Sequence, residues 1–449
     1  MQKTILILLI LSGCALIRNE SRVSNHGRWK KYINTEESGF EEKKLRLAHD
    51  FFNELNSPAL LVTHKGKVSF CWGDCERRFM IHSIWKSIMN PVYGQYSYQG
   101  KLDLKKTLSE IGIDDKEGLS QIEKSATVSN LLQARSGVYH PTFHETPEMR
   151  KYKPKRWSKR PGEKWVYNNW DFHALKTIFE KETGRQLISS IEELFKEIDF
   201  EDYESTHVKE VHNKDVSFHS SLQLRLSSRD LARIGQLYLD KGLWDGKRFF
   251  SEKWVDKSWQ SHTLKESSKW KEWIGDYGLL WWSFDVNGVK TYSAAGVGTQ
   301  FLTVIPSKKM VVVFRVDSYR DQKIHPNKFK KLLSLLLDSH DPKLENPTAK
   351  YEYAFKNNEG KKSYLLDLPL KFLGKYQSKY GTHEIVKKNG RLQVDGPIGV
   401  YSILKSSKEN YSLEDIRMDL FFKKSPQKEK KLDFIFNKNG EISSLFFYY

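Results

Sequence analysis

The chain has 449 residues, of which 39% are hydrophobic and 29% charged, and it carries a formal net charge of +18. This apolar fraction can enclose a large core and more than one domain, which excludes a mainly disordered protein. The positive charge would suit binding to nucleic acid, but no groove-reading or base-stacking motif accompanies it, so we expect no nucleic-acid partner. We interpret most lysines as surface residues that are solvated by water.

The first fourteen residues predict export and attachment to a membrane. Lys3 precedes a largely apolar run over residues 4–11, and the sequence Leu-Ser-Gly-Cys ends at Cys14. The run is shorter than the roughly 20 apolar residues that span a bilayer, so residues 1–13 indicate a signal peptide that is removed. Its end resembles a bacterial lipoprotein box, which implies that Cys14 is acylated. The alternative is an ordinary signal peptide with a chance cysteine.

This N-terminus predicts a location in the cell envelope, with the chain anchored by lipid in the outer membrane or on a periplasm-facing membrane surface. Residues 14–40 are polar and weakly patterned, so we expect a tether between the anchor and a folded body. The membrane is then a partner through the N-terminal lipid. Anionic polymers of the envelope are further partners that the positive charge would favour.

Cys71 and Cys75 follow an alternating apolar stretch. Their CxxxC spacing is weak for a metal site, which needs a second pair or histidines at ligand spacing. The spacing does not decide between a local disulfide and two unpaired structural cysteines. His140 and His144 have HxxxH spacing, but Pro141 between them indicates a loop, so we predict no metal and no cofactor.

The chemistry begins at Ser83 and Lys86. A serine and a lysine three residues apart on a helix lie on one face, so the amine can reach the hydroxyl. A serine hydroxyl needs an adjacent base to attack at neutral pH, and a lysine serves if burial disfavours its charged form. That burial would come from the apolar neighbours Ile84, Trp85, Ile88 and Met89.

Three other pairs share the SxxK spacing, and a second motif selects among the four. An apolar helix behind the serine is lacking in the other three, which begin at Ser268, Ser402 and Ser425. The motif Tyr167-Asn168-Asn169 follows Ser83 but precedes those three, and this order favours Ser83. A buried tyrosine hydroxyl beside a lysine can shuttle a proton, and the Asn169 amide can hold the lysine or a substrate carbonyl.

Residues 150–164 hold eight lysines and arginines directly before this motif, so we expect those cations to rim any cleft that it lines.

A third motif, residues 293–300, places small residues ahead of two apolar strand-like runs. Small residues let a strand come close to a bound substrate, and an amide there can join that of Ser83 as a second oxyanion donor. A plain glycine-containing hairpin is the alternative.

In this order, the three motifs resemble those of the serine β-lactamase and penicillin-binding protein superfamily, in the branch with YxN that holds class C β-lactamases, esterases and 6-aminohexanoate-dimer hydrolases. The resemblance covers about residues 51–338. It implies that Ser83 is the acylated nucleophile, Lys86 its helical partner and Tyr167 the general base and acid. It further implies an oxyanion hole from the amides of Ser83 and Val297, and substrate contacts from Asn169 and Gly296.

The resemblance also implies an α/β (α+β) fold, a serine hydrolase domain over residues 41–340 with an antiparallel sheet and a helical lobe. Within it, Ser227 carries the capping chemistry that predicts a helix start. Short alternating runs and turn signals such as Asn389-Gly390 predict a β-rich C-terminal domain over residues 341–449.

The expected function is a serine hydrolase that acts through an acyl-enzyme on a small-molecule ester or amide. Where β-lactam-recognising relatives carry a cation, this chain has Ala294, which disfavours a substrate carboxylate and favours an esterase-like activity. A β-lactamase or D-alanyl-D-alanine carboxypeptidase of the same fold is the first alternative. A non-catalytic binding lipoprotein is the second, and intact Ser83, Lys86 and Tyr167 argue against it.

Overall fold

The computed structural model describes residues 27–263, 274–316, 318 and 324–355, together with seven strands between residues 374 and 448. Cys14, the predicted signal peptide and the first half of the tether lie outside the described residues, as do Ser268 and Ser425 of the competing SxxK pairs. Ser402 and Lys405 lie in strand β18 (Gly399–Lys405) and not in a helix, so this pair lacks the helical geometry.

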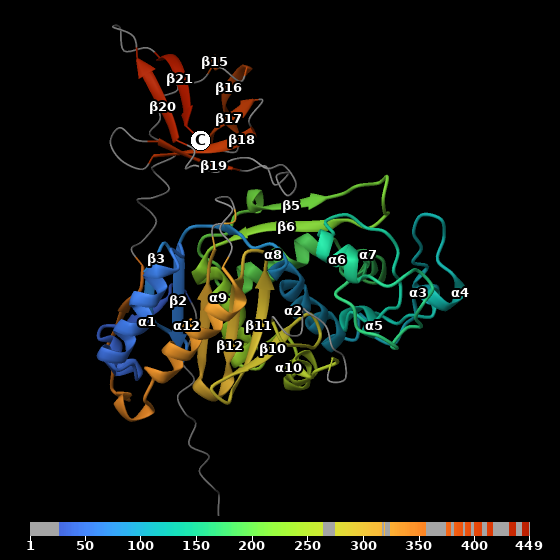
Figure 1. Ribbon diagram of the computed structural model, residues 1–449, viewed down its shortest axis with the longest axis horizontal. Coiled ribbons are helices and arrows are strands. Elements are labelled where there is room, and N and C mark those ends of the chain that lie inside the picture. Colours follow the sequence, from blue (N-terminus) through green and yellow to red (C-terminus); the bar gives the residue numbers. More distant parts are fainter. Residues whose placement is uncertain are drawn as a thin grey trace, which may run out of the picture.

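One nine-stranded sheet forms the centre of the fold (Figure 1). In spatial order its strands are β14 (Tyr351–Tyr353), β1 (Lys30–Tyr32), β3 (Lys67–Gly73), β2 (Ala59–His64), β13 (Met310–Phe314), β12 (Gln300–Ile305), β11 (Val289–Gly296), β10 (Trp282–Val286) and β9 (Asp276–Tyr277). All neighbours are antiparallel except β1 and β3. Strands β2, β12 and β13 are buried along their whole length, as expected for a sheet covered on both faces.

Helices cover both faces of this sheet. On one face lie α1 (Glu42–Glu54) and α12 (Pro326–Asp338), where Phe329 stacks on Phe301 at 4.4 Å between ring centroids. The other face carries α2 (Ile84–Tyr98) and α9 (Ser228–Leu239). A Cβ on Gly235 of α9 would lie 2.5 Å from Val311, so the glycine lets this helix approach the sheet. The Ser227 hydroxyl caps α9, as predicted.

A helical lobe and short strands complete this part of the chain. The lobe contains α3 (Leu108–Ile111), α4 (Gln121–Lys124), α5 (Val128–Leu132), α6 (Pro147–Tyr152), α7 (Asn169–Thr183), α8 (Leu187–Glu197) and α10 (Glu252–Trp259). Two small sheets consist of β4 (Phe79–Met80), β6 (Ser221–Leu226) and β5 (Val208–Val211), and of β7 (Leu243–Trp244) and β8 (Lys247–Arg248). The predicted α/β (α+β) fold with an antiparallel sheet and a helical lobe is confirmed. Across the described segments, none of the helices has the length and apolar character needed to cross a membrane.

The C-terminal strands form a separate seven-stranded antiparallel sheet (Figure 1). Each strand pairs with the next in the chain, in the order β15 (Gly374–Ser378), β16 (Gly381–Lys388), β17 (Arg391–Gly396), β18, β19 (Tyr411–Asp415), β20 (Lys431–Phe436) and β21 (Ile442–Tyr448). The predicted turn residues Asn389-Gly390 lie outside the described residues. This sheet supplies the β-rich C-terminal part of the predicted fold.

The boundaries predicted at residues 40 and 340 need correction. Strand β1 lies inside the predicted tether, yet it pairs with β3 and β14, and Phe40 is fully buried. Strand β14 lies beyond residue 340 and also joins the central sheet. Both strands have only three residues with polar or tyrosine side chains, so they are too short to show the alternation that reveals a strand.

Cys71 and Cys75 form a disulfide, which decides between the two alternatives that the spacing left open. Cys71 lies in β3, and Cys75 follows where the chain leaves the sheet. The carbonyl oxygen of Cys75 accepts hydrogen bonds from the amides of Ser228 and Arg229. The disulfide therefore closes a short loop at the end of β3, and the backbone of Cys75 connects this loop to the first turn of α9.

Asn90 anchors α2, which carries the predicted nucleophile at its start. Its buried side chain donates to the carbonyl oxygen of Leu279 at 2.7 Å. Its Oδ1 accepts from the indole of Trp254 at 2.8 Å, from the hydroxyl of Ser258 at 3.2 Å and from the hydroxyl of Tyr238. One side chain thus joins α2 to α9, to α10 and to the segment before β10.

We expect Asn90→Ala to lower the free energy of unfolding by about 3 kcal/mol, because it leaves buried donors of Tyr238 and Trp254 without an acceptor. Urea denaturation of the whole chain measures this change. Ser97→Ala, near the exposed end of the same helix, should change the free energy by less than about 0.5 kcal/mol. A loss below about 1 kcal/mol for Asn90→Ala would contradict this account of the anchor.

Candidate active site

Ser83 stands at the start of α2, directly after a sharp turn. His82 has a left-handed backbone (φ 50°), which few non-glycine residues adopt. Before it, the amide of Ile81 donates to the carbonyl oxygen of Leu224 in β6, which fixes the chain ahead of the turn. The amide of Ser83 therefore belongs to the helix start, where N–H groups lack partners within the helix.

Strand β11 passes close to this turn, and Gly296 allows the approach. A Cβ on Gly296 would lie 2.5 Å from the carbonyl oxygen of Ile81, closer than real side chains come. Strand β10 pairs with β11 only as far as Ser293, so the last three residues of β11 are unpaired on that side. The amides of Ser83 and Val297 donate to no other group among the described residues, so both can serve as oxyanion donors.

The buried amine of Lys86 contacts the other polar groups of the two motifs. Its Nζ lies 3.0 Å from Oγ of Ser83, 3.0 Å from the hydroxyl of Tyr167 and 2.9 Å from Oδ1 of Asn169. Burial disfavours the charged amine and lowers the pKa of Lys86 to about 7. A large fraction of Lys86 is therefore neutral at neutral pH, in the form that can accept a proton.

The YxN motif lies at the start of α7, and its two functional side chains are held in place. The side-chain amide of Asn169 donates to the carbonyl oxygen of His144 at 2.8 Å, which turns its own oxygen toward Lys86. Tyr167 packs against Trp282, with ring centroids 5.4 Å apart. Burial raises the pKa of Tyr167 well above its usual value, so the hydroxyl keeps its proton at neutral pH.

These groups line a cavity of about 310 Å³, which is the size of a small-molecule site. Among the lining residues in the described ranges, Lys86 is the only lysine, arginine, aspartate or glutamate. Much of the wall is apolar and consists of Trp85, Met149, Leu222, Ile274, Trp282, Ala295, Phe301, Ile324 and Pro326. The described wall of the cavity is therefore mostly apolar and carries little charge.

Three histidines also line the cavity, and burial keeps them neutral. It lowers the pKa of His82 to about 3 and that of His144 to about 4, and it holds the pKa of His173 well below its usual value. Nδ1 of His173 is 2.9 Å from the hydroxyl of Thr142, which orients the ring. Neutral imidazoles offer hydrogen bonds to a substrate but no positive charge at neutral pH.

All the site residues predicted on the three motifs line this one cavity. They are Ser83, Lys86, Tyr167, Asn169, Gly296 and Val297. Ala294 is fully buried and does not line the cavity, whereas its neighbour Ala295 does. The position that would have needed a cation for carboxylate recognition thus presents no polar group.

The basic rim expected from residues 150–164 is wrong, because none of those lysines and arginines lines the cavity. Several of them face acidic partners instead. Arg156 pairs with Glu123 at 3.2 Å, and Lys153 pairs with Glu145 at 2.6 Å. The charge run serves the structure of the lobe rather than the cavity.

The sequence analysis did not predict the histidines that line the cavity. His144 was considered only as part of an HxxxH pair with His140. In the structure, His140 interacts with the carbonyl oxygens of Pro141 and Lys116. His173 lies four residues after Asn169 in α7, and residues four apart on a helix share a face. That spacing from the YxN motif could have predicted His173 in the cavity.

The sequence matches the profile of a protein family described as Beta-lactamase over residues 53–328. Among solved structures, an octameric penicillin-binding protein homologue from Pyrococcus abyssi is 17% identical, covering 90% of this chain and 99% of that chain, with a TM-score of 0.48. A class C beta-lactamase is 16% identical over 67% of this chain and 97% of that chain, with a TM-score of 0.48. SurE is 15% identical over 91% of this chain and 97% of that chain, with a TM-score of 0.49. No curated protein matches the sequence.

We expect the reactivity of Ser83 toward a fluorophosphonate probe to rise with pH and to level off above about pH 7. Below the pKa of Lys86, each pH unit removes about nine-tenths of the remaining neutral amine, so the labelling rate should fall about tenfold per unit. Labelling rates measured from pH 5 to 9 give this profile. The control is Lys86→Arg, whose guanidinium stays charged, so it should label slowly at every pH. A flat profile between pH 5 and 7, or fast labelling of Lys86→Arg, would exclude Lys86 as the base.

Proposed function

The chain belongs to the beta-lactamase family of serine hydrolases, and on that premise we propose that it hydrolyses a small, neutral ester or amide through an acyl-enzyme on Ser83. One observation carries the proposal. A buried amine with a pKa near neutrality, that of Lys86, lies 3.0 Å from both the Ser83 hydroxyl and the Tyr167 hydroxyl. This arrangement can remove the serine proton and return it to a leaving group.

In the first step, Oγ of Ser83 attacks the substrate carbonyl carbon while its proton passes to the neutral amine of Lys86. Tyr167 is not the resting base, because its raised pKa keeps the hydroxyl protonated. It instead relays the proton between Lys86 and the leaving group, which departs as the acyl-enzyme forms. The amides of Ser83 and Val297 bind the developing oxyanion, an interaction worth about 3 kcal/mol per donor. Water then releases the acyl group by the reverse path.

The charge of the cavity supports a neutral substrate. β-Lactams and D-alanyl peptides both present a carboxylate, and a charge-assisted hydrogen bond to such a group is worth about 1.5–3 kcal/mol. The described lining offers Lys86 alone, and the catalytic role requires that amine to be neutral. The β-lactamase or D-alanyl-D-alanine carboxypeptidase alternative is therefore less favoured than an esterase or amidase.

We expect p-nitrophenyl acetate and butyrate to exceed a chromogenic cephalosporin in kcat/KM by at least about tenfold, because the described lining offers no charged cation to pair with the cephalosporin carboxylate. Steady-state assays of the whole chain provide the comparison, and Ser83→Ala should abolish every activity. Faster turnover of the cephalosporin would support the β-lactamase alternative. If no substrate is turned over and no phosphonate labels Ser83, the non-catalytic lipoprotein would be the better interpretation.

We also propose that the chain is an exported lipoprotein anchored through Cys14. The lipoprotein-like sequence at residues 11–14 supports this proposal. The disulfide between Cys71 and Cys75 agrees with it, since disulfides persist mainly in oxidising compartments outside the cytoplasm. A single acyl chain holds a protein weakly, so stable anchoring would require the additional lipid or basic surface that two-signal anchors use.

We expect Cys14→Ala to move the protein from the membrane fraction to the soluble fraction, because the acceptor of the lipid is lost. Fractionation of expressing bacteria followed by immunoblotting measures the distribution. The matched control is Ser12→Ala, which keeps the cysteine and a small residue two positions before it, and should stay with the membrane. Equal membrane association of Cys14→Ala and the unaltered chain would exclude the lipid anchor.

A further inference from the structure

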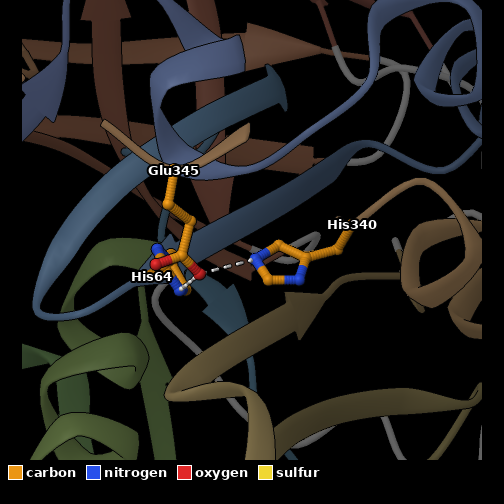
Figure 2. Close-up of side chains that lie close together, drawn as sticks. All are labelled: His64, His340 and Glu345. Atoms are coloured by element: carbon orange, nitrogen blue, oxygen red, sulfur yellow. Dashed lines mark ion pairs between the residues drawn. The ribbon is translucent and has the colours of Figure 1, made fainter. Parts of the chain in front are cut away.

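A buried cluster of two histidines and one glutamate lies apart from the residues of the catalytic cavity (Figure 2). His64 ends β2, His340 follows α12, and Glu345 follows the short helix η5 (Pro342–Leu344). The side chains of His64 and His340 are 2% and 1% exposed, and that of Glu345 is 18% exposed. None of the three lines the catalytic cavity, so the proposed hydrolysis makes no use of them.

The three side chains converge on one point. Nε2 of His64 lies 3.3 Å from Oε1 of Glu345, and Nε2 of His340 lies 3.6 Å from the same oxygen. All three ligand atoms lie within 4.8 Å of one another. In a tetrahedral zinc site with bonds of about 2.0–2.1 Å, ligand atoms are about 3.4 Å apart. Two separations fit such a site closely, and the third, which is at most 4.8 Å, would have to shorten by up to about 1.4 Å.

The Nε2 atom of His340 is an unsatisfied group in this cluster. It is buried and makes no hydrogen bond to any described residue. Gly39 leaves space beside it, since a Cβ at that position would lie 2.8 Å from the nitrogen. Its contact with Oε1 of Glu345, at 3.6 Å, is too long for a hydrogen bond, and a buried nitrogen in this position calls for an explanation such as an ion.

We propose that His64, His340 and Glu345 bind one divalent transition-metal ion of the zinc type, through Nε2 of each histidine and Oε1 of the glutamate. Surrounding groups hold the ligands in the required orientation. The Tyr32 hydroxyl lies 3.4 Å from Nδ1 of His64, and Lys65 pairs with the other carboxylate oxygen of Glu345. Outer partners of this kind, on the far nitrogen and the far oxygen, accompany most metal ligands.

The donor set distinguishes among cations. Two imidazoles and one carboxylate oxygen suit zinc, cobalt, nickel or copper, whereas magnesium and calcium require several oxygen ligands. The charge of Lys65, which pairs with Glu345, further disfavours cations that are held by charge alone.

The position of the cluster indicates a structural role for the ion. His64 lies beside the turn between β2 and β3, while His340 and Glu345 belong to the segment that connects α12 to β14. An ion there would link the first strands of the central sheet to the chain that leads into its outermost strand. Metal binding of this kind stabilises the folded state, because the unfolded chain does not hold the three ligands together.

The test is metal binding and thermal stability of the whole chain after removal of metal with a chelator. We expect calorimetric titration with Zn²⁺ to give one ion per chain, and Co²⁺ to give the visible absorption of a tetrahedral site. Excess Zn²⁺ should raise Tm by about 5 °C, while Mg²⁺ and Ca²⁺ at the same concentration should not. If the unaltered chain binds no Zn²⁺ and its Tm does not move, the proposal is wrong, whatever the variants show.

Variants then locate the ion. His340→Gln should weaken Zn²⁺ binding at least a hundredfold, and Tyr32→Phe, which removes only an outer partner, by about tenfold. His212→Gln is the matched control, because it removes an exposed histidine far along the chain from the cluster. Glu345→Gln provides a second, more exposed ligand change if His340→Gln does not fold. Unchanged affinity in both ligand variants would place the ion elsewhere and overturn the proposal.

Discussion

The burial of one amine is the constraint on which the catalytic cavity depends. Removing a charged ammonium from water is strongly unfavourable, so a buried lysine must either lose its charge or find partners. Lys86 has the oxygen atoms of Ser83, Tyr167 and Asn169 around it. The same burial lowers its pKa to about 7, so the cost of enclosing the group is also the source of its basicity.

Contacts from distant parts of the chain maintain that enclosure. Asn90 joins α2 to the helical lobe, the backbone of His144 turns Asn169 toward Lys86, and Gly296 lets β11 approach the turn before Ser83. Each contact crosses between elements that are far apart in sequence. Losing any one of these contacts would misplace a catalytic group.

The sequence predicted the parts of this arrangement that depend on local pattern. Three features can be recognised in the amino-acid sequence alone: the apolar runs of β12 and β13, the cap at Ser227 and the order of the three motifs. Strands β1 and β14 were missed because three-residue polar strands carry no periodic signal. The cluster of His64 and His340 was missed because its members share no ligand spacing and meet only through the tertiary fold.

Of the sequence features, net charge said least about the cavity, because several cations of the basic stretch are paired with acidic residues. The basic stretch before the YxN motif was expected to rim the cleft, yet Arg156 and Lys153 face Glu123 and Glu145 within the lobe. A cation that is already paired contributes little field to a neighbouring cavity, and the wall itself is mostly apolar. Substrate choice here should therefore depend on the shape and apolar surface of the cavity, and only weakly on the overall charge of +18.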